Sequence, residues 1–447
     1  MSSLKDLLNA RTLLVLGVCS LALGGCSDDD DDDDNVDPGD DIVVLTGTIV
    51  DNLTLTADKE YLLRGGVFVG NGTDMTVLTI EPGTVIYGES ATNGMLVVNR
   101  GSRIMAEGTA QAPIVMTSDK AVGDRGRSDW GGLIINGRAP LNSGDVAFGE
   151  GGTGTYGGTN PADDSGVLKY VRVEFAGREI SPDNELNGIA FQGVGSGTTV
   201  DYIQVHMGKD DGVEMFGGNV NIKHVLVTGC GDDQLDWTDG WRGKGQFIAI
   251  QMYGDAGDRG IEADNNGEDN DAAPRSHPTL YNLTIVADRA AAAGNNGIGM
   301  LLREGTGASI HNAIVLGFRD CGIDVDHEAT FLNGWSGTGL NGNLVVNHSI
   351  FHDNVEAWQT GESDEAGFPF TTQQFISVLN GNNRFVNPNL TDPYNKTAPN
   401  FLPQAGSIAL SGGATPPADG FFDATATYVG AFGAVDWTAG WTTHAIN

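Results

Sequence analysis

Lys209–Gly218, KDDGVEMFGG, has the pattern that returns most often along the chain. The shared form is an acid, a variable residue, usually glycine, one branched apolar residue and usually a second acid. A motif that repeats at a nearly constant interval is typical of a solenoid. Close variants are Gly231–Asp236, Asp258–Glu262 and Asp320–Asp324, and weaker echoes are Leu186–Ala190 and Asn295–Gly299.

Short runs rich in branched apolar residues recur from Ile42 onward, bounded by glycine, asparagine and aspartate. They predict strands rather than helices. Comparable runs are roughly 18 to 23 residues apart, which is enough for one circuit of three short strands, whereas a β-propeller blade needs about twice that period. We therefore predict an all-β fold, a right-handed parallel β-helix in which like residues stack on successive circuits.

Four regions follow from the composition. Residues 1–25 are predicted to be a signal peptide, 26–41 an acidic disordered tether, 42–400 the β-helix and 401–447 a C-terminal cap, because the tail is rich in aromatic residues and a solenoid must cover its last open circuit. Four longer segments interrupt the repeat and are expected to be loops: 142–166, 264–278, 328–343 and 356–370.

The N-terminus has the pattern of an export signal: Lys5 and Arg11, then the apolar run Leu13–Leu23, then Gly24-Gly25-Cys26. Leu23-Gly24-Gly25-Cys26 resembles the bacterial lipobox, which implies a lipid anchor on Cys26. Serine at position 27 favours an outer-membrane address. The alternative is an ordinary cleaved signal. No later stretch approaches the ~20 apolar residues that a membrane-spanning helix requires.

The aspartate run Asp28–Asp34 cannot pack, so it is expected to extend as a tether. It also resembles the export signals of surface lipoproteins, and a solvated spacer is the alternative. The formal net charge of −35 makes nucleic acid an unlikely partner, because phosphate binding needs a basic surface. Cys230 and Cys321 belong to different repeats, which argues against a disulfide between them.

Aligning the repeats produces two acidic columns. Their first three units are 22 and 26 residues apart, so their acids are expected to lie one circuit apart and to repel one another. Water, backbone N–H groups, a nearby arginine or a bound cation must offset that repulsion. Calcium is the candidate cofactor, since it takes six to eight oxygen ligands. The candidate metal ligands are Asp210, Asp232 and Asp258 in one column, continued by Asp320, and Glu214, Asp236 and Glu262 in the other, continued by Asp324.

The loop Asp264–Asp271 offers further oxygens for the same cation. It departs from the EF-hand order, because Asp269 stands where that motif needs glycine. The alternative is that the aspartates of both the loop and the columns cap turns of the backbone.

A ligand-binding surface is expected beside these acids, formed by Trp237, Trp241, Arg242 and Tyr253. Exposed aromatic faces next to polar groups suit a glycan. The alternative is that the rings stack along the sides of the solenoid. A polysaccharide lyase or hydrolase on the same scaffold is a further possibility, although Gly231-Asp232-Asp233 lacks the companion motifs of polygalacturonase-like hydrolases.

Three runs of sequence carry a family resemblance. LTIEPGTVIYG and the stretch up to DWGGLIINGRAP, then DDGVEMFGG up to WRGKGQF, and the ending YVGAFGAVDWTAGWT are similar to bacterial outer-membrane lipoproteins with a predicted right-handed parallel β-helix, some of them labelled "multidrug transporter". The resemblance implies fold and location but no activity. The sequence thus favours a lipid-anchored, surface-exposed β-helix that binds an extracellular ligand, with a glycan as the candidate; the alternatives are the enzyme and a structural partner of an outer-membrane receptor.

Overall fold

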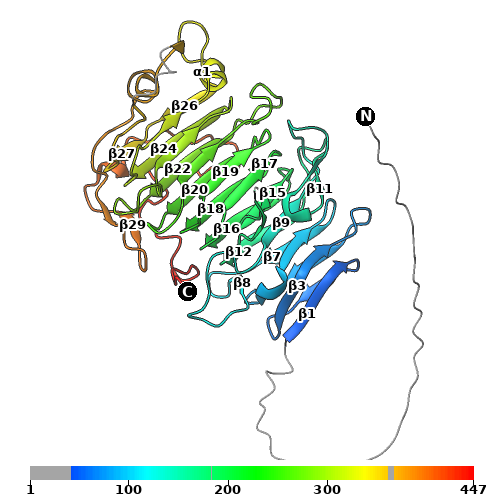
Figure 1. The fold of residues 1–447 in the computed structure, drawn as a ribbon. Helices are drawn as coiled ribbons and strands as arrows, with labels where there is room; N and C mark the ends of the chain where they lie inside the picture. Colours follow the sequence, from blue (N-terminus) through cyan, green and yellow to red (C-terminus); the bar gives the residue numbers. More distant parts are fainter. Residues whose placement is uncertain (1–41, 183, 361–366) are drawn as a thin grey trace, which may run out of the picture. The chain divides into compact units, whose positions relative to one another are not determined.

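Parallel strands wind into a solenoid along most of the chain (Figure 1). The structure, a computed structural model, describes residues 42–182, 184–360 and 367–447. Within these residues a single sheet of 23 strands is formed, and its strands pair in parallel from one circuit to the next. The predicted all-β parallel β-helix is therefore confirmed. We call each circuit a rung.

Each rung has three faces. Face A is formed by β2 (Leu53–Leu55), β4 (Val77–Ile80), β7 (Arg103–Glu107), β26 (Leu344–Asn347) and the first halves of six longer strands, β12 (Gly166–Glu174), β16 (Thr199–His206), β18 (Asn221–Thr228), β20 (Lys244–Gln251), β22 (Thr279–Val286) and β24 (Ala308–Leu316). Face B is formed by the second halves of those six strands, the first halves of β1 (Ile42–Ile49) and β3 (Glu60–Val69), and β5 (Val85–Gly88), β8 (Ile114–Ser118) and β27 (Ile350–His352). Face C is formed by the second halves of β1 and β3 and by β6 (Met95–Val98), β9 (Gly132–Asn136), β15 (Ile189–Gln192), β17 (Val213–Phe216), β19 (Leu235–Thr238), β21 (Arg259–Ala263), β23 (Ile298–Leu302) and β25 (Asp324–Val325).

The six long strands serve two faces because each bends at one residue with positive φ. These residues are Tyr170, Tyr202, His224, Phe247, Asn282 and Asn312, with φ between 48° and 60°. They occupy the same place on successive rungs, so their side chains stack: the ring centroids of Tyr202 and His224 are 4.1 Å apart. Stacking offsets part of the cost of the left-handed backbone.

The core is a column of apolar residues along the axis of the solenoid. On face C, Val213, Leu235 and Ile261 are register partners and are 0% exposed. The residue after each of them points outward, because side chains alternate along a strand. Val213, the branched apolar residue of KDDGVEMFGG, therefore faces the core.

The end of the solenoid is covered by segments other than the predicted cap. Phe331 in α1 (Glu328–Asn333) joins the core cluster, as do Phe370, just before the short helix α2 (Thr372–Gln374), and Phe375 and Ile376 in the π-helix η4 (Phe375–Leu379). The last strand of the large sheet ends at His352, and one further parallel bridge pairs Ile350 with Arg384.

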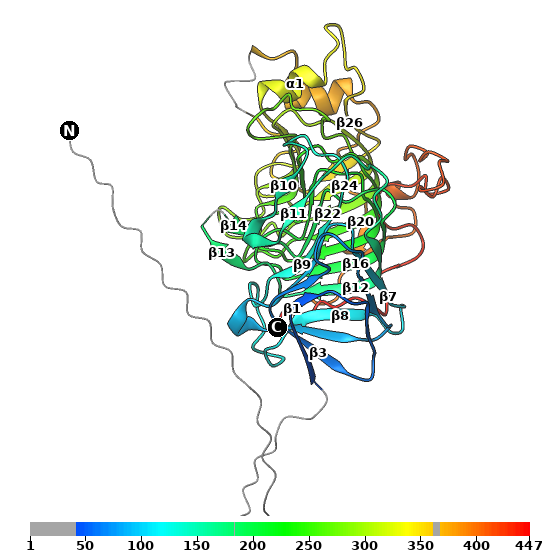
Figure 2. The same ribbon diagram turned by 90° about the vertical axis from the view of Figure 1, so that its right-hand side faces the viewer.

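Residues 401–447 instead run back along the outside of face B (Figure 2). Backbone groups of Gly430, Asp423 and Thr443 bond to β24, β20 and β16 in turn. Phe432 and Val429 pack on outward-facing residues of face B such as Leu226. The prediction of a terminal cap here is wrong, because the apolar tail covers a side of the sheet rather than its open end.

Three of the predicted loops leave face C, after β9, β21 and β25; the first two touch each other, and the third touches the turn after β23. Asn142 Nδ2 donates to the backbone oxygen of Asn265 at 3.1 Å. The third loop contacts the turn after β23, where Asn333 Nδ2 donates to the backbone oxygen of Thr306 at 3.0 Å. The loops and turns contain the small elements β10 (Ala147–Phe148), η2 (Glu150–Gly152), β11 (Thr155–Tyr156), β13 (Glu179–Ser181) and β14 (Asn184–Glu185); η1 (Ser90–Thr92), β28 (Leu390–Asp392), β29 (Asn400–Pro403) and η5 (Ile408–Leu410) lie elsewhere.

Cys230 and Cys321 are both buried, and neither is in a disulfide. No helix in the described part of the chain is long and apolar enough to cross a membrane. The predicted signal peptide, Cys26 and the tether lie outside the described residues.

Candidate functional site

An outward-facing column of acids runs up face C. Glu214 in β17 is the register partner of Asp236 in β19, and Asp236 is the partner of Glu262 in β21. This is the predicted second column. It does not continue directly to Asp324, because Leu301 of β23 stands between Glu262 and Asp324.

The first column lies in the turns just before these strands. The backbone N–H groups of Asp232 and Asp258 donate to the carbonyls of Asp210 and Asp232, so the three residues occupy adjacent rungs as predicted. Asp320 lies beyond an intervening rung, since Gly297 pairs with Asp258 and Asp320 pairs with Gly297.

The second acid of each Asp-Asp doublet forms an additional column. Asp211 and Asp233 are only 7% and 4% exposed. Asp211 Oδ1 accepts from the backbone N–H of Asp233 at 2.9 Å, and Asp233 Oδ1 accepts from that of Arg259 at 2.7 Å. These acids therefore cap the next rung, which is partly the turn-capping alternative. In the sequence, the Asp-Asp doublets of KDDGV and GDDQL are the feature that could have indicated Asp211 and Asp233 as site residues.

One half of the acidic region is neutralised by arginine. Arg303 Nη2 is 2.8 Å from Glu262 Oε1, and its Nε is 2.9 Å from Asp264 Oδ1. Arg259 pairs with Asp258 and lies 3.6 Å from Glu262. At this end, protein cations offset the carboxylate charge.

The other half has no such partner. Oxygens of Asp211, Glu214 and Asp236 lie within 4.8 Å of one another, and no basic group of the described residues is within 4.0 Å of any of them. Burial, and then the neighbouring carboxylates, raise the pKa of all three side chains well above their ordinary values. A second triplet, Asp210, Asp211 and Asp232, shares Asp211 and is more exposed at Asp232. Both are acidic clusters that could hold a metal ion.

Asn187 is a buried polar residue that contacts the acidic cluster. It precedes β15 as Asp211 precedes β17, so the two residues lie on adjacent rungs. Its Nδ2 donates to Glu214 Oε2, and it is 2% exposed. Its Oδ1 is buried without a hydrogen-bond partner among the described residues, as is Asp236 Oδ1. A buried oxygen without a donor is costly unless something fills the gap.

Loop residues form a wall beside these acids, where β10, β11, β13 and β14 cluster in Figure 2. The Tyr156 ring lies 6.1 Å from Phe216, at the end of β17. The loop that contains Glu150 is tied to the β13–β14 hairpin by the Gly151 N–H, which donates to Asn184 Oδ1 at 2.7 Å. Partial burial, followed by repulsion from Glu185, raises the pKa of Glu150 to about 7.

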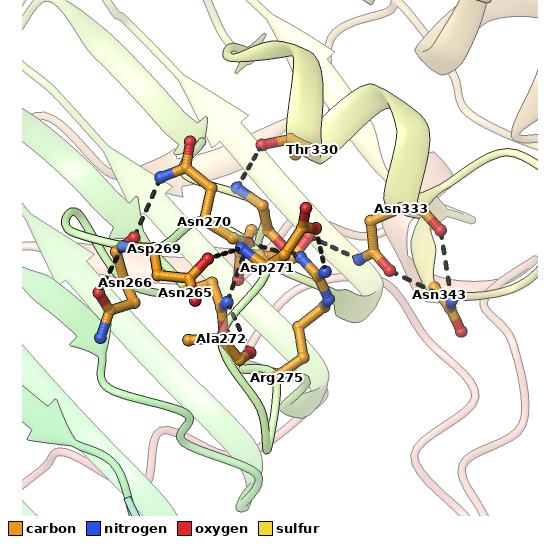
Figure 3. A network of polar contacts seen from close by, with 12 residues as sticks. Asn265, Asn266, Asp269, Asn270, Asp271, Ala272, Arg275, Thr330, Asn333 and Asn343 are labelled. Carbon is orange, nitrogen blue, oxygen red and sulfur yellow. Dashed lines mark hydrogen bonds and ion pairs between the residues drawn. The ribbon is translucent and has the colours of Figure 1, made fainter. Parts of the chain in front are cut away.

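Within the loop Asp264–Asp271, side-chain oxygens of Asn266 and Asp269 bond to the loop's own backbone (Figure 3). Asn266 Oδ1 accepts from the backbone of Glu268 and Asp269, both at 3.0 Å. Asp269 Oδ1 accepts from Asp271 N, and Asp271 is 2.7 Å from Arg275. The turn-capping alternative therefore describes this loop better than a cation site does.

The expected aromatic surface is wrong. Trp237 and Trp241 are 0% exposed and Tyr253 is 3% exposed. Their polar atoms bond inside the protein, Trp237 Nε1 to Thr306 at 3.2 Å and Trp241 Nε1 to the Val220 carbonyl at 3.1 Å. For Trp237 the cause is strand alternation: Asp236 points outward, so Trp237 must point inward. Arg242 alone is exposed, and it donates to the Arg275 carbonyl.

Partly exposed aromatic rings lie instead under the C-terminal tail. The rings of Tyr202, His224 and Phe247 border a cavity of about 330 Å³ together with Tyr428 and Trp437. One face of the Trp437 ring is covered, because Phe432 stacks on it at 5.2 Å, and His224 lies 5.4 Å from Trp437 in an edge-to-face arrangement.

Comparison with known proteins agrees with this architecture. The chain matches the protein family described as "Pectate-lyase like beta helix domain" over residues 47–442. No curated protein and no solved structure matches it. Because the match spans nearly the whole described solenoid, the chain belongs to the family of pectate-lyase-like β-helix domains.

Proposed function

We propose that the protein binds a hard divalent cation, with calcium as the candidate, between Asp211, Glu214 and Asp236, and uses it to hold an extracellular glycan. The observation that carries the proposal is that these three carboxylates meet within 4.8 Å with no ion-pair partner among the described residues. Acids one rung away have arginine partners, so the lack of one is particular to this half.

The energetics favour an additional positive charge. Two carboxylates about 5 Å apart repel by roughly 3 kcal/mol at an effective dielectric of 20. Either protons or a cation must relieve three such pairs at neutral pH. Oxygen-only ligands suit calcium, and the buried Asn187 Oδ1 and Asp236 Oδ1 add an amide and a carboxylate oxygen without other partners.

A glycan is the candidate ligand because a partly coordinated cation takes hydroxyl or carboxylate oxygens from outside. The loop wall with Tyr156 and Glu150 stands beside the column and offers hydrogen-bonding groups. Trp237, Trp241 and Tyr253 are not part of this proposal, since they are buried.

The test is isothermal titration of calcium into the metal-free protein at pH 8. The Asp236→Asn variant should lose at least tenfold in affinity. The matched control is Asp258→Asn, which removes an acid from the neighbouring column where Arg259 already pairs with it; its affinity should stay within twofold. Equal losses in both variants would show that bulk negative charge, rather than this cluster, attracts the ion. A glycan array with and without calcium then tests the ligand.

A second candidate is carboxylate-catalysed cleavage of a polysaccharide. It is favoured by one observation, Glu150, whose pKa partial burial raises to about 7, on the wall beside Glu214. A group with that pKa can donate a proton at neutral pH. Product analysis with the wild type and Glu150→Gln decides: shortened products that the variant fails to make support cleavage, and intact ligand refutes it.

The lipid anchor and the outer-membrane location are also proposals. They rest on the lipobox-like Leu23-Gly24-Gly25-Cys26 and on the acidic run that follows it.

A further inference from the structure

A cavity of about 330 Å³ opens beside the first of the face C loops. It is lined by Arg100 and Arg138, by Asp145 and Val146, and by residues 157–160. Arg100 follows β6 and Arg138 follows β9, and these strands are register neighbours, so the two arginines come from adjacent rungs. In a chain with 24 basic and 59 acidic side chains, two arginines in one cavity form a local exception.

Backbone carbonyls, rather than carboxylates, position these guanidinium groups. Arg100 Nη1 donates to the Gly157 oxygen at 3.0 Å, and Arg138 Nη2 approaches the Arg100 oxygen at 3.5 Å. Neither arginine has an acidic oxygen within 4.0 Å in the part of the chain that the structure describes. Two like charges are therefore held near one another without an ion pair.

The Arg138 side chain is also fixed by shape. A Cβ on Gly101 would lie 2.2 Å from Arg138 Nη2, so the guanidinium rests directly on the glycine backbone. On the other side, a Cβ on Gly158 would lie 2.8 Å from the Arg138 carbonyl. Because Gly101 and Gly158 have no side chains, the cavity stays open, and their backbone atoms hold Arg138 in place.

We infer that Arg100 and Arg138 form a binding site for an oxyanion, a sulfate, phosphate or carboxylate group. Guanidinium groups recognise such groups through paired N–H donors, and arginine presents them in a rigid plane. Two acidic residues lie close to the site. Asp145 lines the cavity and opposes an anion, and the buried Asp163 lies near Arg138, which counteracts the rise in its pKa that burial causes.

This site is independent of the cation cluster. It lies toward β6 and β9, whereas Glu214 and Asp236 lie on β17 and β19, with β15 between the two groups of strands. Failure of calcium binding would leave it untouched, and its own failure would leave the cation proposal untouched.

The test is isothermal titration of the folded chain with sodium sulfate, sodium phosphate and sodium acetate, with sodium chloride at matched ionic strength as the blank. We expect saturable binding of one anion per chain. Preference for sulfate or phosphate identifies a tetrahedral group, and preference for acetate identifies a carboxylate. Arg100→Gln and Arg138→Gln should each weaken binding at least tenfold, Arg138→Lys by less, and Asp145→Asn should strengthen it.

The matched control is Arg125→Gln, because among the described residues Arg125 also has no ion pair; it bonds to the Lys120 carbonyl and to Thr117. Its affinity should stay within twofold of the wild type. Equal weakening in Arg125→Gln, unchanged binding in both cavity variants, or no saturable binding by the wild type would each overturn the inference. Melting curves of every variant separate lost binding from lost folding.

Discussion

Charge at three side chains governs the chemistry of face C. Asp211, Glu214 and Asp236 lie on adjacent rungs, and their pKa values are raised first by burial and then by one another. Glu262, on the next rung, is held by Arg303 at 2.8 Å. At one end of the column, arginine therefore neutralises the carboxylate charge. At the other end, the carboxyl groups must take up protons or bind a cation.

The raised pKa values predict a pH dependence of stability. A carboxyl group whose pKa is higher in the folded state binds its proton more tightly there, so its contribution is fully present below the unfolded value, near pH 4, and is lost as pH rises through the folded value. Without calcium, the melting temperature should fall as pH rises above about 4, and Asp210 and Glu262, whose pKa values burial raises to about 7, should add to the fall around that pH. With calcium it should fall much less, because the cation replaces the protons.

The control for this prediction is the behaviour of carboxylates with the opposite shift. The hydrogen bond from Arg127 lowers the pKa of Asp255, against the opposing effect of partial burial, so that group loses its stabilising effect only as pH falls below about 4. A calcium-free melting temperature that rises steadily from pH 5 to pH 8 would contradict protonation of the cluster.

Burial of Trp237 gives a further prediction. The ring is 0% exposed and bonds to Thr306, so Trp237→Phe should reduce the free energy of unfolding by about 1–3 kcal/mol. Arg242→Ala, at an exposed residue only five positions away, should change it by less than about 0.5 kcal/mol. Denaturant unfolding measures both, and equal effects would argue against the buried position of Trp237.

At the scale of elements, the strand repeat was predictable because each rung must place a branched residue inward at the same point. The interval between Thr199 and Asn221, register partners in β16 and β18, is 22 residues and lies within the predicted range. The same repeat predicts the two acidic columns. It does not predict the hydrogen bonds that Asp211 and Asp233 make to the next rung, because those bonds depend on backbone geometry that the spacing does not encode.

The aromatic residues and the tail were harder to predict for a related reason. Alternation could have placed Trp237 inward, but its proximity to the acids suggested a surface role. The apolar residues of the tail indicated only that it covers something. Which surface it covers depends on outward-facing residues such as Leu226 and Ile314, which read as ordinary strand residues in the sequence.

Docking of the tail on face B should depend on Phe432. This ring is 2% exposed and stacks on Trp437 and on Phe401, at 5.2 and 5.4 Å. Phe432→Ala should cost about 3–5 kcal/mol and speed hydrogen exchange of the tail amides while β16 to β24 stay protected. Val435→Ala, at a 71% exposed residue, is the control and should change neither. Uniform loss of protection along the solenoid would show that the tail does not dock as a separate element.

In the molecule as a whole, three long loops leave the same face of a regular solenoid, face C. Loop 142–166 stands beside the cation cluster, and loop 264–278 contacts loop 142–166 through Asn265 and Asn142. Loop 264–278 also contacts the turn after β23 through Arg275 and Gly305, and α1 contacts the same turn through Asn333 and Thr306. A rigid solenoid with functional loops on one edge is a common arrangement for binding proteins.

The proposed anchor makes a prediction about the whole chain in the cell. Cys26→Ser should move the protein from the membrane fraction to the soluble fraction after export, because the cysteine that accepts the lipid is gone. Ser27→Ala is the control and should stay with the membranes. Fractionation with immunoblotting measures this, and a membrane-bound Cys26→Ser protein would refute the anchor.

The central claim is that a cation occupies the uncompensated half of the column. The most direct measurement is an anomalous difference map from crystals grown at pH 8 with calcium. We predict a peak between Asp211, Glu214 and Asp236, within about 2.3–2.6 Å of their oxygens. A map with no peak there, and with the carboxyl groups hydrogen-bonded to one another, would contradict the account.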